Sequence, residues 1–247
     1  MTGPIAFVRG LRRPAAFHGA GVTSGFFEGW YVKLVSADLS QRWAVIPGIF
    51  RGLESTENMA FVQILDGLTG RSWFHQFPIA EFEAATDRFE VRVGKNRFNT
   101  EGAHLELPQL TGDVKYGSAL DPWPVTFTEP GIMGWYGMVP AMECFHAVVS
   151  FGHSLTGSLL VEGKQTDFSG GRGYIEKDWG KAFPEGYVWL ASNHIEGAPD
   201  ASLIASVAII PWLRSSFRGF IIGFIEVSAV AFGYGEQAGE LAFSRIA

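Results

Sequence analysis

The chain has 247 residues, of which 47% are hydrophobic and 18% are charged, and its formal net charge is −6. This acidic balance argues against a nucleic-acid-binding protein, because contacts to phosphates need clustered Lys and Arg side chains. A single cysteine, Cys144, excludes an internal disulfide and a cysteine-based zinc site.

Alternation of apolar and polar residues dominates the chain, and no window has the pattern of a long amphipathic helix. In chain order, the predicted strands are 27–35, 43–50, 60–65, 72–76, 88–93, 103–107, 110–116, 144–150, 155–161, 173–175, 187–192, 202–210 and 217–227. Turn signals such as Asp66-Gly67, Gly152-His153 and Ser169-Gly170-Gly171 separate them. Many short strands at close spacing predict an all-β protein built from barrels or sandwiches.

Residues 121–140 interrupt this rhythm with four prolines and with Trp123, Trp135 and Tyr136 between them. Proline lacks a backbone donor, so the segment is not a central strand. It is expected to be a long, aromatic-rich connection that either covers the mouth of a barrel or packs as an ordinary loop.

Two short segments echo each other, because residues 26–30 and 183–187 both read Phe-x-Glu-Gly-aromatic where a predicted strand begins. Together with the number of strands, the echo predicts two antiparallel barrels with similar opening strands. The first is expected over residues 1–168, including the connection at 121–140, and the second over 169–247. The second is shorter and ends in a Gly/Ala/Ser-rich tail, so we expect it to be incomplete.

No segment reaches the roughly 18 to 20 uninterrupted apolar residues of a membrane-spanning helix. The first 20 residues carry Arg9, Arg12 and Arg13 but no apolar core of a signal peptide. A cytoplasmic protein is expected, with exposed aromatic side chains available for peripheral contact with a membrane.

Glu28 is the first candidate for catalysis. In an extended strand it shares a face with Phe26, Trp30, Val32 and Leu34, and this apolar face is expected to point into the barrel. Burial raises the pKa of a carboxyl group, and a neutral carboxylic acid in an apolar pocket can donate a proton. The alternative is a structural acid bonded to backbone amides or to an arginine.

Glu143 raises the same question further along the chain. It shares a predicted strand face with Phe145, Ala147, Val149 and Phe151, which is again apolar. The same two roles, proton donor or buried structural acid, are open for it.

The densest polar cluster is Tyr174-Ile175-Glu176-Lys177-Asp178-Trp179-Gly180. Extended geometry places Tyr174, Glu176 and Asp178 on one face and Lys177 on the other. Two carboxylates on one face can push their pKa values apart and leave one of them protonated near neutral pH. Alternatively, Lys177 and a nearby arginine neutralise both acids at a solvated rim.

Polar contacts to a mostly apolar cavity are also expected from Trp189, Asn193 and His194, although a histidine at a strand end is usually structural. Three histidines show no metal-ligand spacing with one another or with carboxylates: His75, His146 and His153. The chain has no nucleophile elbow, phosphate-binding loop or dinucleotide fingerprint, which argues against such hydrolases, nucleotide enzymes and nicotinamide-dependent oxidoreductases.

Several blocks together resemble the tocopherol cyclase family. These blocks are residues 27–33 (Phe-Glu-Gly-Trp-Tyr-Val-Lys), 134–136 (Gly-Trp-Tyr), 142–146 (Met-Glu-Cys-Phe-His), 173–184 (Gly-Tyr-Ile-Glu-Lys-Asp-Trp-Gly-Lys-Ala-Phe-Pro), 210–212 (Ile-Pro-Trp) and 217–220 (Phe-Arg-Gly-Phe). They occur in the family's order between residues 26 and 227. The family continues beyond the point where this chain's tail becomes unfamiliar.

The resemblance implies paired lipocalin-like barrels, related to carotenoid hydratases, whose apolar interior accepts an isoprenoid. It also implies an isomerase that closes a prenylated, phytyl-type benzoquinol to a chromanol without a cofactor or metal ion. An acid protonates the alkene nearest the ring, and the phenol oxygen captures the tertiary carbocation. The candidate acids are Glu28, Glu143, Glu176 and Asp178. The side chains expected to contact the substrate are Trp30, Trp135, Tyr136, Tyr174, Trp179, Trp189, Asn193 and His194.

Two other functions stay open from the sequence. The first is a lipocalin-like carrier that binds an isoprenoid or another lipid without reacting. The second is a hydratase, in which water captures the carbocation. In all three readings the partner is a small hydrophobic molecule, and no nucleic acid is expected.

Overall fold

The structure is a computed structural model that describes residues 10–126, 131–139, 142–212, 215–226, 229–236 and 244–245. Alternating side chains set the orientation of its first strand, β1 (Phe26–Val35). Glu28, Trp30 and Val32 are completely buried on one face of β1, whereas Gly29 and Tyr31 lie on the other, partly covered face. The predicted division of this strand into two faces is therefore confirmed.

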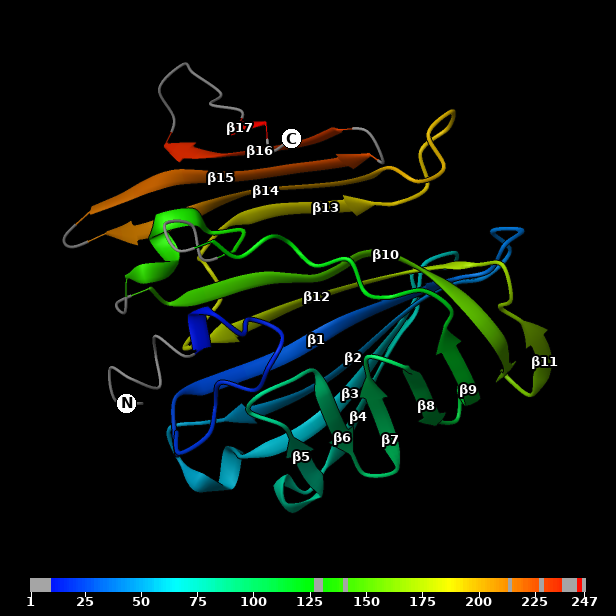
Figure 1. Cartoon of the computed structure of the whole chain (residues 1–247). Helices are drawn as coiled ribbons and strands as arrows, with labels where there is room; N and C mark the ends of the chain where they lie inside the picture. The colour runs from blue at the N-terminus through cyan, green and yellow to red at the C-terminus, as the bar shows by residue number, and fades with distance from the viewer. Residues whose placement is uncertain are drawn as a thin grey trace.

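The described part of the chain forms two antiparallel sheets (Figure 1). The larger sheet has the order β4-β3-β2-β1-β12-β10-β9-β8-β7-β6-β5, with β11 paired to β10 beside this path. Its further strands are β2 (Arg42–Arg51), β3 (Met59–Asp66), β4 (Ser72–Phe77), β5 (Phe82–Ala84), β6 (Glu90–Val93), β7 (Asn96–Asn99), β8 (Gly102–Glu106), β9 (Leu110–Tyr116), β10 (Cys144–Val161), β11 (Lys164–Asp167) and β12 (Arg172–Gly180). The all-β class is confirmed.

The second sheet has the order β13-β14-β15-β16-β17 and lies as a layer above β10 and β12 in Figure 1. Its strands are β13 (Tyr187–Ser192), β14 (Ser202–Trp212), β15 (Ser215–Glu226), β16 (Ala229–Glu236) and β17 (Ser244–Arg245). Three short 3₁₀ helices complete the described elements: η1 (Ser55–Glu57), η2 (Ile79–Glu81) and η3 (Gly134–Met138).

The larger sheet curls around a core of buried apolar side chains. The core joins Trp30 and Leu34 of β1 to Phe98 of β7, Leu110 of β9 and Leu155 of β10, all of which are almost completely buried. Large interlocking side chains of this kind leave little room for a ligand. This core occupies the interior of the first barrel, and the expectation that an apolar barrel interior accepts an isoprenoid stays a prediction.

Strand β10 runs without a break where a turn at Gly152-His153 was expected. Its first half pairs with β12 and its second half with β9, and the register with β12 shifts between Val148 and Ser150 and again before His153. Such bulges let a strand bend without ending. Gly152 faces the guanidinium of Arg172, and a Cβ at this glycine would lie 2.5 Å from Nη2.

The boundary between the two sheets also differs from the expected division at residues 168 and 169. Strand β12 pairs with both β1 and β10 in the first sheet, so the second sheet begins only at β13. As a central strand, β12 is covered on both faces, which explains why almost all of its residues are buried.

Part of the Gly/Ala/Ser-rich tail forms a strand like those before it, because β16 pairs with β15 from Ala229 to Glu236. Residues 237–243 and 246–247 of the tail lie outside the described residues. That the second barrel is incomplete stays a prediction.

The connection expected at 121–140 packs between the two sheets rather than over a barrel mouth, as far as it is described; residues 127–130 and 140 are not. Trp123 and Ile132 are buried against Val148 of the first sheet and Ile204 of the second. The Trp123 backbone N–H donates to the Val148 carbonyl at 3.1 Å. The connection therefore helps to hold the sheets together.

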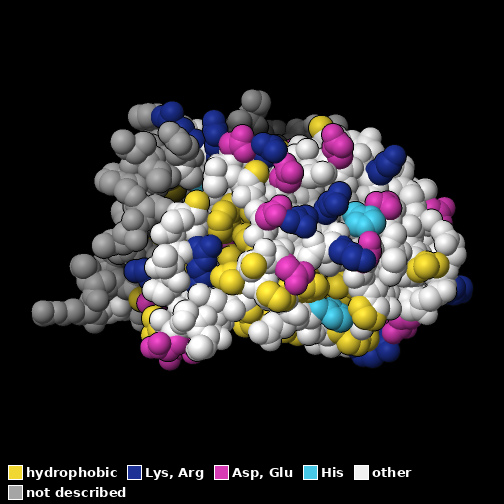
Figure 2. Space-filling model, turned by 90° about the horizontal axis from the view of Figure 1, so that it is seen from below, with side chains coloured by type: hydrophobic (Ala, Val, Ile, Leu, Met, Phe, Trp, Pro, Cys, Tyr) yellow, Lys and Arg dark blue, Asp and Glu magenta, His cyan; other side chains and the backbone are white. Residues whose placement is uncertain are grey.

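The face of the molecule seen from below carries charges of both signs, interspersed with small apolar patches (Figure 2). Exposed ion pairs of the first sheet include Arg92 with Glu83 and Lys95 with Glu106. None of the helices among the described residues has the length and apolar character needed to span a membrane.

Candidate functional site

A cavity of about 410 Å³ lies between the two sheets. It is lined by residues of β1, β2, β3, β10 and β12 on one side and of β13, β14 and β15 on the other. Its aromatic side chains are Phe27, Tyr31, Phe61, Phe183, Tyr187 and Trp189. A largely apolar cavity with a few convergent polar groups is the usual form of a small-molecule site.

Strand register brings three titratable side chains together at this cavity. His146 of β10 lies directly opposite Asp178 of β12, and Glu176 is two residues away on the same face of β12. The His146 Nδ1 atom is 2.8 Å from Asp178 Oδ1, and Nε2 is 3.7 Å from Glu176 Oε2. All three residues line the cavity.

Glu176 is buried and accepts two hydrogen bonds from the side chains around it. The Tyr174 hydroxyl donates to Oε2 at 2.6 Å, and the Trp189 indole N–H donates to the same oxygen at 3.1 Å. Burial raises the pKa of Glu176 to about 7, against the lowering effects of His146 and of these hydrogen bonds, and the charge of Asp178 adds to the rise. Glu176 can therefore exchange a proton near neutral pH.

The pKa of His146 is raised, whereas burial alone would lower the pKa of an imidazole. Burial lowers its pKa, but the charge and the hydrogen bond of Asp178, together with the charge of Glu176, raise the pKa of His146 to about 9. Its Nε2 atom is buried and has no hydrogen-bond partner among the described residues. The side chain is therefore an imidazolium that holds one carboxylate while it faces the second.

The raised pKa of His146 is directly testable. We expect its imidazole to stay protonated until about pH 9 in an NMR titration, and Asp178→Asn to move this midpoint towards the ordinary value of 6.5. Because the pKa is raised on folding, the pair adds stability that is complete below pH 6.5 and is lost as the pH rises through about 9. A midpoint near 6.5 in the unchanged protein would contradict this geometry.

The same three side chains offer donor atoms within 4.8 Å of one another, close enough for a metal ion. The sequence shows no metal-ligand spacing between His146 and a carboxylate. In the folded chain, however, His146 lies close enough to Glu176 and Asp178 for all three to bind one ion, so the expectation drawn from spacing is wrong. His146 Nδ1 is hydrogen-bonded to Asp178, so the residues are arranged as an ion pair. That the protein uses no metal stays a prediction.

Glu28 lies on the opposite face of the sheet from this cavity, inside the first barrel. Its carboxylate accepts hydrogen bonds from the backbone N–H groups of His18 and Gly19, each at 3.0 Å, and lies 2.5 Å from Lys177 Nζ. Burial alone would raise the pKa of Glu28, but the charge of Lys177 and the hydrogen bonds of His18 and Lys177 hold it below the ordinary value. The expected rise in its pKa is wrong, and the geometry fits the structural alternative.

Lys177 completes this buried cluster. Its Nζ atom donates to the carbonyls of Pro14 and Ala16 and lies over the rings of Trp30 and Trp179, at 4.8 and 4.6 Å from their centroids. Burial lowers the pKa of Lys177 to about 8, against the raising effect of Glu28. Lys177 therefore neutralises a buried acid inside the barrel, not an acid at a solvated rim.

The remaining candidates fall into four groups. Tyr174 and Trp189 belong to the cavity cluster, as described above. Trp30 and Trp179 belong to the interior with Lys177, where Trp179 stacks on His18 at 4.1 Å. Glu143 is exposed just before β10 and does not line the cavity, so it is apart from the other acids.

The last four candidates lie at the edges of the space between the sheets. Tyr136 lines a smaller neighbouring cavity. Trp135 is 43% exposed, and its ring stacks on the ring of Tyr136. Asn193 is buried and donates to the Gly173 carbonyl at 2.7 Å, which is a structural contact. His194 is exposed at the end of β13.

Sequence reasoning missed three features of the cavity wall. His146 was not among the predicted site residues, because only the spacing of residues along the chain was considered. The signal that identifies His146 is the pairing of its strand with the strand that carries Asp178. Tyr31 lies on the face of β1 opposite Glu28, and this face lines the cavity. The cross-strand pair Gly29 and Gly48 leaves room for the Phe61 ring, which lies against Gly48.

This glycine pair allows a matched test of packing. A Cβ at Gly48 would lie 2.4 Å from Phe61 Cζ and 2.8 Å from the Glu28 carbonyl oxygen, whereas a Cβ at Gly29 meets no atom closer than 3.6 Å. We expect Gly48→Ala to lower the free energy of unfolding by about 1–3 kcal/mol. Gly29→Ala is its control and should have a much smaller effect in urea unfolding. Equal effects of the two substitutions would contradict the packing of Phe61.

Sequence comparison gives two matches. A family model described as "Tocopherol cyclase-like" matches residues 119–234, a range that includes His146, Glu176 and Asp178 but not Glu28. The chain is 30% identical, over 241 aligned residues, to a chloroplastic protein of Oryza sativa subsp. japonica named as a probable tocopherol cyclase. That match covers 77% of this chain and 51% of the relative, so the chain spans about half of the relative's length.

Solved structures show likeness of fold alone. An AttH-type protein of Nitrosomonas europaea has a TM-score of 0.53 at 9% identity, with 89% of this chain and 91% of that chain covered. CghA in complex with Sch210972 has a TM-score of 0.52 at 10% identity, with 83% of this chain and 59% of that chain covered. These neighbours agree with the lipocalin-like, all-β architecture expected from the sequence.

Proposed function

We propose, given that this chain is tocopherol cyclase-like, that it is an isomerase that closes a prenylated, phytyl-type benzoquinol to a chromanol in the cavity between the sheets. In this proposal Glu176 is the proton donor. His146 and Asp178 form the ion pair beside it that controls its protonation.

The observation that carries the proposal is the pairing of a half-protonated acid with an apolar cavity. The pKa of Glu176 is raised to about 7, so a large share of this carboxyl group is neutral at physiological pH. Among the described residues, the hydrogen bonds of Tyr174 and Trp189 and the contact of His146 all involve Oε2, and we assign Oε1 to the contact with the ligand. An acid with a pKa near the working pH is best suited to transfer a proton.

The proposed reaction balances within the substrate and one carboxyl group. Glu176 donates its proton to one carbon of the alkene, so that the positive charge develops on the other, tertiary carbon. The phenol oxygen then forms the new C–O bond to this tertiary carbon. The phenolic proton then returns to the Glu176 carboxylate. The product is an isomer of the substrate, so the reaction needs no oxidant or reductant.

The walls of the cavity suit a short-lived cation. Aromatic faces attract positive charge, and a dry apolar wall keeps water away from the cation. Tyr31 packs edge-on against Trp189, with ring centroids 5.3 Å apart. Burial and the charge of Glu176 raise the pKa of Tyr31 to about 12, so its phenol stays neutral beside the acid.

The test is incubation of the purified chain with a phytyl-type benzoquinol under reducing conditions, followed by chromatography of the products. A chromanol that forms in proportion to the protein supports the proposal. A tertiary alcohol would show that water captures the cation, as in a hydratase. Saturable binding without conversion would identify a carrier, and either of these two results would overturn the isomerase.

A further inference from the structure

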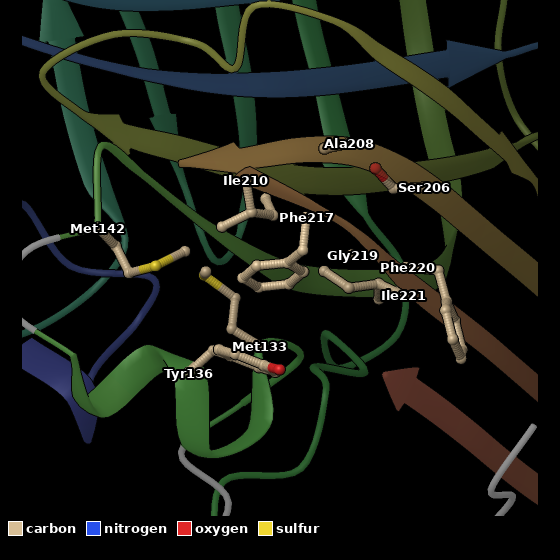
Figure 3. A pocket seen from close by; sticks show the side chains of 10 residues that line it. All are labelled: Met133, Tyr136, Met142, Ser206, Ala208, Ile210, Phe217, Gly219, Phe220 and Ile221. Carbon is tan, nitrogen blue, oxygen red and sulfur yellow. The ribbon is translucent and has the colours of Figure 1, made fainter. Parts of the chain in front are cut away.

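A second, smaller cavity adjoins the proposed site. It has a volume of about 60 Å³, and none of its ten lining residues is charged (Figure 3). Five residues line both cavities: Met133, Ser206, Ala208, Ile210 and Ile221. The two cavities therefore share a wall, and the smaller one continues the larger away from the polar cluster.

Strand pairing gives this shared wall a notch. Six lining residues of β14 and β15 form three successive cross-strand pairs on one face: Ser206 with Ile221, Ala208 with Gly219, and Ile210 with Phe217. Phe220 of β15 also lines the smaller cavity. The middle pair is by far the smallest, and it lies between two pairs that contain a large side chain. Directly paired residues lie on the same face of a sheet, so the small pair leaves a notch in that face. Ile210 and Phe217 border its Gly219 side, because a Cβ at this glycine would lie 3.0 Å from Ile210 Cγ1 and 3.4 Å from Phe217 Cε2.

Flexible side chains lie opposite the notch. Figure 3 shows Met133 and Met142 pointing towards Ile210 and Phe217 from the connection between the sheets. Unbranched thioether side chains adapt to the shape of an apolar ligand. Met133 also links the two regions, because its sulfur lies 3.3 Å from the backbone nitrogen of His146.

We propose that the smaller cavity receives the far end of the isoprenoid chain, and that Ala208 and Gly219 set the longest chain that the site can hold. This inference rests on the proposed function for the identity of the ligand. The quinol ring lies at His146, Glu176 and Asp178, and the tail runs along the face of β14. Its last unit lies over Ala208 and Gly219, beside the Ile210–Phe217 pair.

The test uses binding and does not depend on turnover. The ligands are prenylated benzoquinones with one, two, three or four isoprene units, and quenching of tryptophan fluorescence reports binding, since Trp189 is part of the cavity wall. Ala208→Phe fills the notch. We expect it to weaken binding of the four-unit ligand by at least about tenfold, because several methylene groups lose their apolar contacts. Binding of the one-unit ligand should change by less than about twofold.

Two further variants make the test specific. Ala208→Val fills less of the notch and should cause a smaller change in the same direction, which keeps the test valid if the larger side chain harms folding. Val207→Phe is the matched control, because Val207 is the neighbour of Ala208 on the outer face of β14 and is 47% exposed. It should leave the dependence on chain length unchanged, and thermal melting confirms that each variant is folded.

The outcomes separate this inference from the proposed function. A change that grows with chain length supports the inference even if the unchanged protein makes no chromanol, in which case the protein is a carrier with the same tail site. An equal change for all four ligands, or none, overturns the inference while leaving the isomerase intact. Failure of the unchanged protein to bind any member of the series overturns both.

Discussion

Lys177→Met is expected to lower the free energy of unfolding by about 3–5 kcal/mol, because it leaves the Glu28 carboxylate buried without its counter-charge. Both side chains are completely buried, and their charged atoms lie 2.5 Å apart. Among the described residues, the carboxylate then keeps the contacts of His18, the backbone N–H of Gly19 and the electrostatic interaction with Arg51. Lys177 also loses its bonds to the carbonyls of Pro14 and Ala16, so the segment before β1 should detach more easily.

Urea unfolding measures this effect, and the double variant Glu28→Gln with Lys177→Met shows its origin. If the penalty comes from an unpaired charge, the double variant should be more stable than Lys177→Met alone. Lys95→Met is the control, because Lys95 forms an ion pair with Glu106 on the surface and should matter little. A Lys177→Met protein as stable as the unchanged chain would refute the buried pair.

The same pair predicts a dependence on pH. The pKa of Glu28 is held below the ordinary value of 4.5, so its contribution to stability is complete above that value and is lost as the pH falls through the folded pKa. Because Lys177 is the main cause of the lowering, Lys177→Met should weaken this acid dependence. Unfolding curves between pH 3 and 6 for the two proteins make the comparison.

Glu176→Gln is expected to reduce turnover of the benzoquinol by roughly 10²–10⁴-fold, the usual contribution of a general acid. The amide keeps the size of the side chain and can still accept from Tyr174 and Trp189, so substrate binding should change far less than kcat. In the unchanged protein the rate should fall as the pH rises through about 7, because only the protonated carboxyl group can donate.

The control for this variant is Glu143→Gln, since Glu143 is exposed and apart from the cavity. It should keep the rate and the pH profile of the unchanged protein. Loss of activity in Glu143→Gln with full activity in Glu176→Gln would reverse the assignment. A drop in affinity as large as the drop in kcat would instead make Glu176 a binding residue.

The alternation of side chains was readable from the sequence because it is local. Each strand has a period of two, so the sequence by itself placed Glu28 with Trp30 on one face of β1, and Glu176 with Asp178 on one face of β12. The all-β class follows from the same alternation, repeated in short strands along the whole chain. The sequence did not reveal the bulges of β10, because Gly152-His153 has the composition of a turn although the strand only bends there.

Which acid meets which base was decided only by the tertiary structure. His146 and Asp178 are 32 residues apart, and only the pairing of β10 with β12 makes them neighbours. Likewise, Lys177 reaches Glu28 because β12 pairs with β1, and this contact lowers a pKa that burial alone would raise. The position of the cavity has the same origin. Large side chains pack inside the first barrel, and the cavity described above lies between the sheets, on the face that carries Glu176 and not Glu28.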